Sequence, residues 1–190
     1  MRRLTMVAAL PFLWALPAYA QLRSFPAAPV VPEKLISSST GSYINNNSFS
    51  YDGLALVDVG NLIGHDNIEG NFVAQDYSET AATGSGTCTA PDGTAGSNYP
   101  FVEDFQINTY PSGDQMIWFF GTGSPVCTSN TTGSFGGTEN GTIVGGSGKF
   151  ANASGPIHES YTGVTISSPA SPGSGYIYID QNTVTGSLTP

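Results

Sequence analysis

The sequence predicts an all-β protein, and two observations support this prediction. Short segments rich in β-branched and aromatic residues follow one another along the chain, and clusters of glycine, proline, asparagine and serine separate them. Segments with the periodicity of an amphipathic helix are absent, and the 24 glycines recur too often for long helices. Many short strands joined by short loops are typical of a barrel or a sandwich.

Turn residues bound each predicted strand. Residues 91–100 form a long turn-rich segment, and Pro-Ser-Gly-Asp at 111–114 separates two strongly apolar segments. Glycines at 145–148 interrupt the chain again before the last two strands. The segments with strand character are 54–59, 70–80, 101–110, 115–123, 131–146, 156–166 and 175–188, which gives seven or eight strands.

The first 20 residues have the features of a secretory signal peptide. Arg2 and Arg3 precede a short apolar run, and Ala18-Tyr19-Ala20 before Gln21 forms an A-x-A cleavage site. The alternative is a short membrane anchor, but the run is too short to span a bilayer comfortably. We therefore expect residues 1–20 to be removed. The mature protein is then secreted, extracellular or periplasmic, with no membrane association after cleavage.

Residues 21–50 are predicted to be a flexible N-terminal segment, and residues 51–190 to be the β-barrel domain. Three prolines lie between residues 26 and 32, and residues 37–48 are a polar stretch of low complexity. The alternative is an edge strand through residues 30–36.

The mature chain is strongly acidic. Without Arg2 and Arg3, three basic residues remain against 14 acidic ones, which gives a net charge of −11. A nucleic-acid backbone or an anionic membrane surface would be repelled, so neither is expected as a partner.

Cys88 and Cys127 are the only cysteines, and a pair of cysteines in a secreted chain is expected to form a disulfide. Closing a loop of this length stabilises the folded state by roughly 4 kcal/mol on the chain-entropy model. The alternative is a nucleophilic or metal-binding thiol. The two histidines, His65 and His158, are not spaced as ligands, so we predict no metal site.

The segment NGTIVGGSGKFANASG, residues 140–155, can be read as a phosphate-binding loop, because Gly146, Gly148 and Ala151 fit the pattern G-x-G-x-x-A. That motif requires a helix directly after the glycines, and Pro156 follows too soon for one. A Walker loop is excluded because Phe150 stands where serine or threonine is required. We interpret the segment as a structural bend with an inward-facing aromatic anchor; its residues are Gly145, Gly146, Gly148, Phe150 and Gly155.

The same segment resembles the glycine-rich signature shared by plant allene oxide cyclases and dirigent proteins. The resemblance covers about residues 140–163. It implies an all-β, antiparallel eight-stranded barrel with a central apolar cavity and no metal or organic cofactor. Members of that superfamily cyclise an unstable epoxide or steer the coupling of phenoxy radicals. No catalytic residue of the family aligns with this chain.

Three residues are candidates for a site inside the barrel. Alternation along strands places Glu103 on one face with Phe101 and Phe105, and Glu159 on one face with Tyr161. A carboxyl on such a face is desolvated if the face points inward. Val73 and Tyr77 form a similar face with Glu79. The alternative is that these glutamates lie at strand ends and reach water.

Two functions remain open. The first is a cavity that binds or steers an apolar or phenolic small molecule, acting as a cofactor-free cyclase or isomerase with Glu103 or Glu159 as the acid and Tyr161 beside it. The second is a non-enzymatic extracellular binding or structural protein whose barrel is filled by its own side chains. Whether the chain is an enzyme is left undecided, and a homo-oligomer is compatible with either function.

Overall fold

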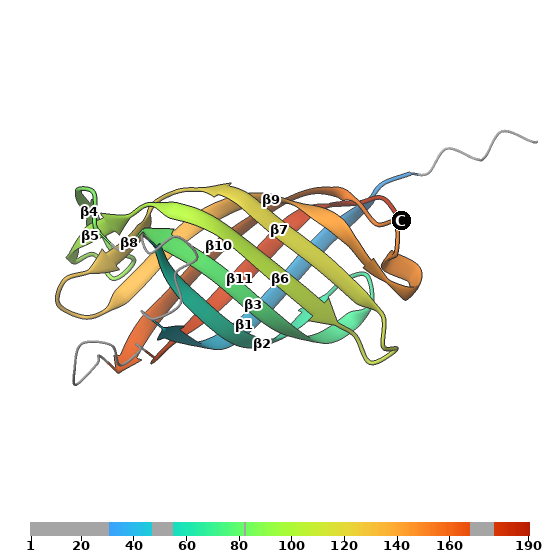
Figure 1. The fold of residues 1–190 in the computed structure, drawn as a ribbon, viewed down its shortest axis with the longest axis horizontal. Coiled ribbons are helices and arrows are strands. Elements are labelled where there is room, and N and C mark those ends of the chain that lie inside the picture. Colours follow the sequence, from blue (N-terminus) through green and yellow to red (C-terminus); the bar gives the residue numbers. More distant parts are fainter. Residues whose placement is uncertain (1–30, 47–54, 82, 168–176) are drawn as a thin grey trace, which may run out of the picture.

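The computed structural model describes residues 31–46, 55–81, 83–167 and 177–190, and its fold is a closed antiparallel barrel of eight strands (Figure 1). This confirms the predicted fold class. The predicted signal peptide and the first part of the predicted flexible segment lie outside the described residues. The barrel strands are β1 (Glu33–Asn46), β2 (Ala55–Asp66), β3 (Gly70–Ala81), β6 (Phe101–Thr109), β7 (Gln115–Gly123), β9 (Ser134–Ser147), β10 (Gly155–Ser167) and β11 (Ile177–Leu188).

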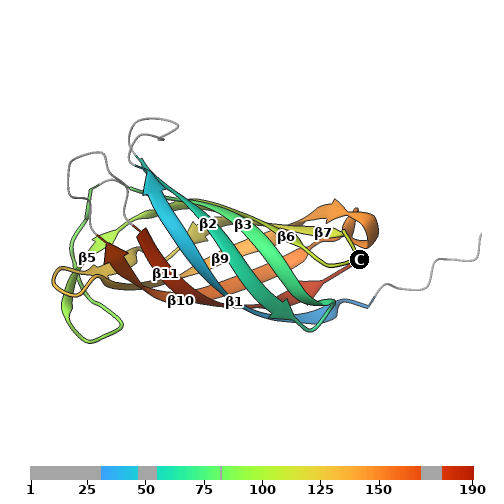
Figure 2. The ribbon, with the colours of Figure 1, turned by 90° about the horizontal axis from the view of Figure 1, so that it is seen from below.

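Neighbouring strands pair in the order β10-β11-β1-β2-β3-β6-β7-β9, and β9 then pairs with β10 to close the barrel. All pairings are antiparallel, and most join strands that follow one another in the chain. The exception is β1, which lies between β2 and the C-terminal β11 (Figure 2). Closure leaves no free sheet edge around the barrel.

The prediction that residues 21–50 form a flexible segment is wrong for β1. Residues Glu33–Asn46 form a full barrel strand that pairs along almost its whole length with β11 and β2. Leu35, Ser37 and Tyr43 are its buried side chains. Small polar residues occupy both faces between Leu35 and Tyr43, so the sequence lacks the apolar alternation that identifies a strand.

One end of the barrel is filled by an apolar core. Phe150 is buried there on the short 3-10 helix η1 (Gly148–Phe150), and its ring lies 5.3 Å from that of Tyr110. Gly148 has a φ of +57°, a left-handed conformation that favours glycine. At Gly146 a Cβ atom would lie 1.8 Å from the carbonyl oxygen of Gln115, so the bend and β7 approach too closely for any side chain. The other core residues include Leu35, Leu62, Phe72, Met116, Trp118, Phe120, Ile143, Ile157, Val184 and Leu188.

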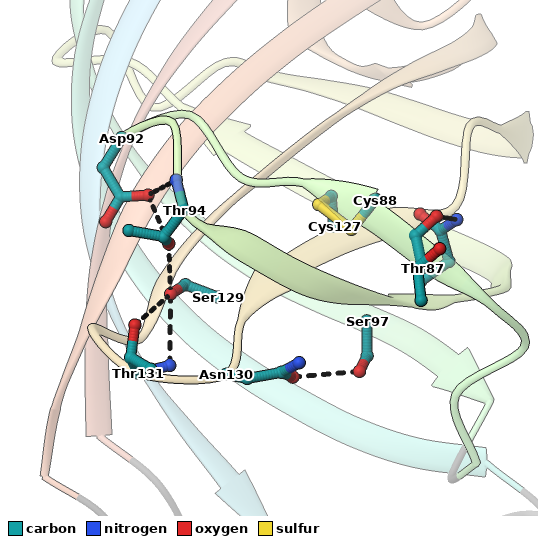
Figure 3. Close-up of a disulfide and its surroundings, with 10 residues drawn as sticks. Thr87, Cys88, Asp92, Thr94, Ser97, Cys127, Ser129, Asn130 and Thr131 are labelled. Atoms are coloured by element: carbon teal, nitrogen blue, oxygen red, sulfur yellow. Dashed lines mark hydrogen bonds between the residues drawn. A yellow bond between two sulfur atoms is a disulfide. The ribbon is translucent and has the colours of Figure 1, made fainter.

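At the opposite end three short strands extend the sheet beyond β9: β8 (Val126–Ser129), β5 (Ala95–Tyr99) and β4 (Thr87–Thr89). A disulfide joins Cys88 on β4 to Cys127 on β8 across the intervening β5 (Figure 3), which confirms the predicted pairing. Gly96 of β5 lies under this bridge, and a Cβ atom there would be 3.2 Å from the Cys88 sulfur. Hydrogen bonds from Thr94 to Asp92 and between Thr94 and Ser129 reinforce the same extension.

Replacing Phe150 by alanine should lower the free energy of unfolding by about 3–5 kcal/mol, because it leaves a cavity in the apolar end of the barrel. Urea denaturation followed by circular dichroism measures this change. Val144→Ala is the matched control, since Val144 is 53% exposed on the neighbouring β9 and should change stability by less than about 0.5 kcal/mol. Equal effects of the two substitutions would show that Phe150 does not anchor this end.

Replacing both cysteines by serine should lower the free energy of unfolding by about 2–4 kcal/mol, because the disulfide restricts the unfolded chain. The urea midpoint of the Cys88→Ser/Cys127→Ser variant measures the loss. The wild-type protein treated with a reducing agent is the control and should match the variant. An unchanged midpoint would contradict a stabilising role.

Candidate functional site

A cavity of about 380 Å³ occupies the half of the barrel next to the β4–β5–β8 extension. Barrel strands supply most of its wall, and Tyr99 of β5 with Val126 and Thr128 of β8 supply the rest. The cavity volume is in the range of small-molecule sites in proteins. The disulfide-linked extension thus forms part of the wall of the cavity.

Six acidic residues line this cavity, and all of them are almost completely buried. They come from six of the barrel strands, one from each, at positions where the alternation of side chains points inward. The residues are Asp58, Asp76, Asp104, Glu139, Glu159 and Asp180.

Glu139 and Glu159 are directly opposite each other on the paired strands β9 and β10. One carboxyl oxygen from each of Glu139, Glu159 and Asp104 lies within 4.8 Å of the other two. Like charges at such positions destabilise a sheet unless protons or a cation neutralise them. Three hard oxygen ligands at this spacing could hold a divalent cation such as Ca²⁺, so these are the described residues with the donor set for a metal.

Burial raises the pKa of each of these three carboxyls, and the neighbouring carboxyls raise it further. The pKa of Glu139 is raised to about 9, mainly by desolvation and then by the charge of Glu159. The pKa values of Glu159 and Asp104 are raised well above their usual values for the same two reasons. At neutral pH the cluster therefore holds carboxylic acids that can donate a proton.

The same effect extends to the other carboxyls on the wall. Desolvation raises the pKa of Asp180 to about 7 and raises that of Asp76 well above its usual value. Asp76 also has a hydrogen-bonding contact with Asp104, and Asp104 has one with Glu139. Two carboxyls can share such a contact only when one of them carries a proton.

Aromatic side chains form the remaining large surface of the cavity. The rings of Tyr43 and Tyr178 stack with centroids 4.8 Å apart, and Phe135 meets Tyr178 edge-on at 5.1 Å. The Tyr161 hydroxyl has a hydrogen-bonding contact with Glu139. Glycine at position 137 leaves room for this group, since a Cβ atom there would lie 2.6 Å from the Tyr161 oxygen.

The buried carboxylate of Asp66 shows how this barrel satisfies an acidic group outside the cavity. One oxygen accepts hydrogen bonds of 2.8 Å from the backbone amides of Ile68 and Glu69, and the other accepts one of 2.5 Å from the Tyr110 hydroxyl. Among the described residues that line the cavity, none is a lysine, arginine or histidine. Lys149 pairs instead with Glu69 at 2.8 Å, beside the apolar end.

The structure places two of the three predicted site residues in the cavity and the third outside it. Glu159 and Tyr161 line the cavity, whereas Glu103 is exposed on the outside of the barrel and its neighbour Asp104 points inward. On β6 and β3 the faces that carry Glu103 and Tyr77 point outward, so for Glu103 the alternative holds and the side chain reaches water. The inward residues of β6 are Asp104, Gln106 and Asn108, and β3 turns Val73 and Tyr77 outward and Asp76 inward.

Sequence reasoning missed most of the acidic cluster: Asp58, Asp76, Asp104, Glu139 and Asp180. One signal could have indicated it. In a chain this poor in charge, Asp58, Asp76, Asp104 and Asp180 each lie within a predicted strand, where acidic residues are depleted.

A larger hollow of about 880 Å³ lies on the outside of the barrel, across strands β11, β1, β2 and β3. It is open to solvent and includes the exposed side chains of Ile63 and Val73. His65, which makes a 3.1 Å hydrogen bond with Asn71, and Tyr110, which donates a hydrogen bond to Asp66, are among its lining residues. The cluster of acidic side chains therefore lies in the smaller internal cavity.

Among the described residues, no helix has the length and apolar character needed to cross a membrane. The disulfide is compatible with an extracellular location. No family model, curated protein or solved structure matches this chain.

Stability should fall as the pH rises from about 5 to 9. The pKa of Glu139 is about 9 in the folded protein against an ordinary value of 4.5, and that of Asp180 is about 7 against 3.8. Both groups are protonated in either state only below about pH 3, under their ordinary values of 4.5 and 3.8. Above that pH the unfolded chain releases protons that the folded one keeps. Each such proton costs about 1.4 kcal/mol per pH unit.

Thermal melting between pH 5 and 9 tests this expectation. Glu139→Gln should reduce the loss of stability across the range because it removes one titrating group from the interior. Glu103→Gln removes the same group from the outer surface and should keep the wild-type slope. Stability that rises with pH over this range would show that the cluster is ionised in the folded state.

Proposed function

We propose that this protein is a secreted barrel that binds a small molecule in its acidic cavity and steers its isomerisation or cyclisation without a cofactor. The observation that carries this proposal is an internal cavity of about 380 Å³ in which carboxyl groups and tyrosine hydroxyls converge. A concave site with several perturbed acids is the usual starting point for assigning a binding or active site.

Glu159 is the group we assign as general acid. It is buried, its pKa is raised well above the usual value by desolvation, and it faces Glu139 across the sheet. Its carboxyl O–H would transfer a proton to an acceptor atom of the ligand. The Glu159 carboxylate left by that transfer would then remove a proton from a neighbouring carbon, so the step is an isomerisation with no net gain or loss of protons and Glu159 is restored.

Tyr161 would position the reacting group. Its hydroxyl contacts Glu139, and its pKa is raised well above its usual value, mainly by burial, so it stays a hydrogen-bond donor. The stacked rings of Tyr43 and Tyr178 provide a flat surface for an aromatic or phenolic ligand. Because the wall is acidic as well as aromatic, a purely apolar ligand fits it less well than one with a polar group.

The family to which the barrel belongs and the cellular location of the protein are part of the same proposal. The glycine-rich segment at residues 140–163 and the closed eight-stranded fold support a place in the allene oxide cyclase and dirigent superfamily. The N-terminal signal sequence and the disulfide support secretion. Self-association as a homo-oligomer remains a prediction that native mass spectrometry can check.

A non-enzymatic binding protein is the second candidate. The half of the barrel next to η1 is filled by its own side chains, as a structural barrel requires. The cavity in the other half favours a protein that binds a ligand. Conversion of the bound ligand to a product separates an enzyme from a binding protein.

Native mass spectrometry of the mature protein with a panel of phenolic and apolar compounds tests binding, and chromatography tests conversion, because an isomerisation leaves the mass unchanged. We expect at least one compound to be retained. Glu159→Gln should lower its conversion by about 10²-fold or more while the fold is kept, because a general acid contributes about 10²–10⁴-fold. Glu103→Gln, with the same change on the outer surface, should convert it like the wild type. Retention without conversion would favour the binding protein.

A further inference from the structure

We propose that the ligand of this cavity is a small organic cation, an ammonium or guanidinium group carried on a flat aromatic body. This inference rests on the proposed function and names the chemical class of its ligand. The argument depends on which hydrogen-bonding partners the cavity wall lacks, on its aromatic surface and on its charge.

Every cavity-lining side-chain atom that is buried without a hydrogen-bond partner is an oxygen. One oxygen of Glu139, one of Glu159 and one of Asp104 belong to this group. A ligand that brings several donors, as an ammonium or guanidinium group does, can pair with these oxygens in place of the protons that the carboxyls otherwise hold. The complete set of these oxygens is Asp76 Oδ1, Asp104 Oδ1, Glu139 Oε2, Glu159 Oε2, Asp180 Oδ1 and Asn182 Oδ1.

Asn182 provides an observation that is independent of the acidic residues. It is 5% exposed, and its side chain has a hydrogen-bonding contact with Asp180 that lowers the pKa of that carboxyl. Its carbonyl oxygen Oδ1 lacks a donor, although the residue lines the cavity. An unpaired buried acceptor costs free energy, and a donor from a ligand removes that cost.

Asp66 shows that this barrel can satisfy a buried carboxylate from within the protein. The carboxylate of Asp66 accepts three hydrogen bonds from within the protein. Asp104, Glu139 and Glu159 face one another, and none of the lining residues that the structure describes is basic. The positive charge that would balance them therefore has to come from protons or from a bound molecule.

The aromatic wall favours an organic cation over a bare metal ion. Tyr43, Tyr178 and Phe135 present ring surfaces to the cavity, and rings attract organic cations within about 6 Å. A volume of about 380 Å³ is also far larger than one ion requires. A metal ion held by Asp104, Glu139 and Glu159 would leave the tyrosines without a role.

Three compounds of one shape separate the effect of charge from that of size. Tyramine is a phenol with an ammonium group, tyrosol carries a neutral hydroxyl in the same place, and 4-hydroxyphenylacetate carries a carboxylate. Isothermal titration calorimetry at pH 7 should give at least about tenfold tighter binding of tyramine than of tyrosol, because charge-assisted hydrogen bonds are roughly twice as strong as neutral ones. No binding is expected for 4-hydroxyphenylacetate.

Two substitutions locate the site. Glu159→Gln and Glu139→Gln should each weaken tyramine binding by about tenfold or more, and the effect on tyrosol should be smaller. Glu103→Gln is the matched control on the outer face and should bind tyramine like the wild type. Circular dichroism of each variant verifies that the barrel is intact.

The outcomes are distinguishable. Equal binding of tyramine and tyrosol would overturn the cationic ligand and leave the small-molecule cavity standing. Failure of all three compounds would overturn this inference, and the wider compound panel would still test the proposed function. Titration of the protein with calcium chloride alone is the remaining measurement. Tight Ca²⁺ binding that Glu159→Gln abolishes, and that blocks tyramine, would replace the organic cation by a metal ion.

Discussion

Closure of the barrel is the constraint on which the rest of this structure depends. Pairing of β9 with β10 joins the two ends of the eight-stranded sheet, so every second side chain of each strand is enclosed whatever its polarity. Burying an acidic side chain is costly unless it is neutralised. In this chain closure encloses a group of acidic side chains in one half of the barrel, and their chemistry follows from that enclosure.

The interior is divided along the barrel axis. Aromatic and aliphatic residues around Trp118 and Phe150 fill the half near η1, and this packed core contributes the apolar burial that folding requires. The acidic cavity occupies the other half, beside the disulfide-linked extension. The apolar packing at one end can offset the free energy that burying acidic groups costs at the other. Proteins whose functional sites are strained or desolvated commonly combine a stable part with a costly one in this way.

The raised pKa values, the unpaired oxygens and the absence of a basic residue on the cavity wall are three consequences of one arrangement. Each carboxyl raises the pKa of the next, so the group stays largely protonated, or it gains a cation from outside. The proposed proton transfer and the proposed cationic ligand are therefore linked: a basic ligand would take up a proton from an acid of the wall, and the resulting ion pair would be held in a low-dielectric site.

The sequence by itself determined the all-β class, the disulfide between Cys88 and Cys127, and the strands around Glu159 and Tyr161. These features depend on local patterns of turns and alternation, or on having only two cysteines. Only the tertiary structure decided that β1 belongs to the barrel and that Asp104, not Glu103, points inward. The physical reason is that alternation divides a strand into two faces without saying which one is enclosed. In this barrel the polar face of β6 lies inside, and only pairing with distant strands fixes that choice.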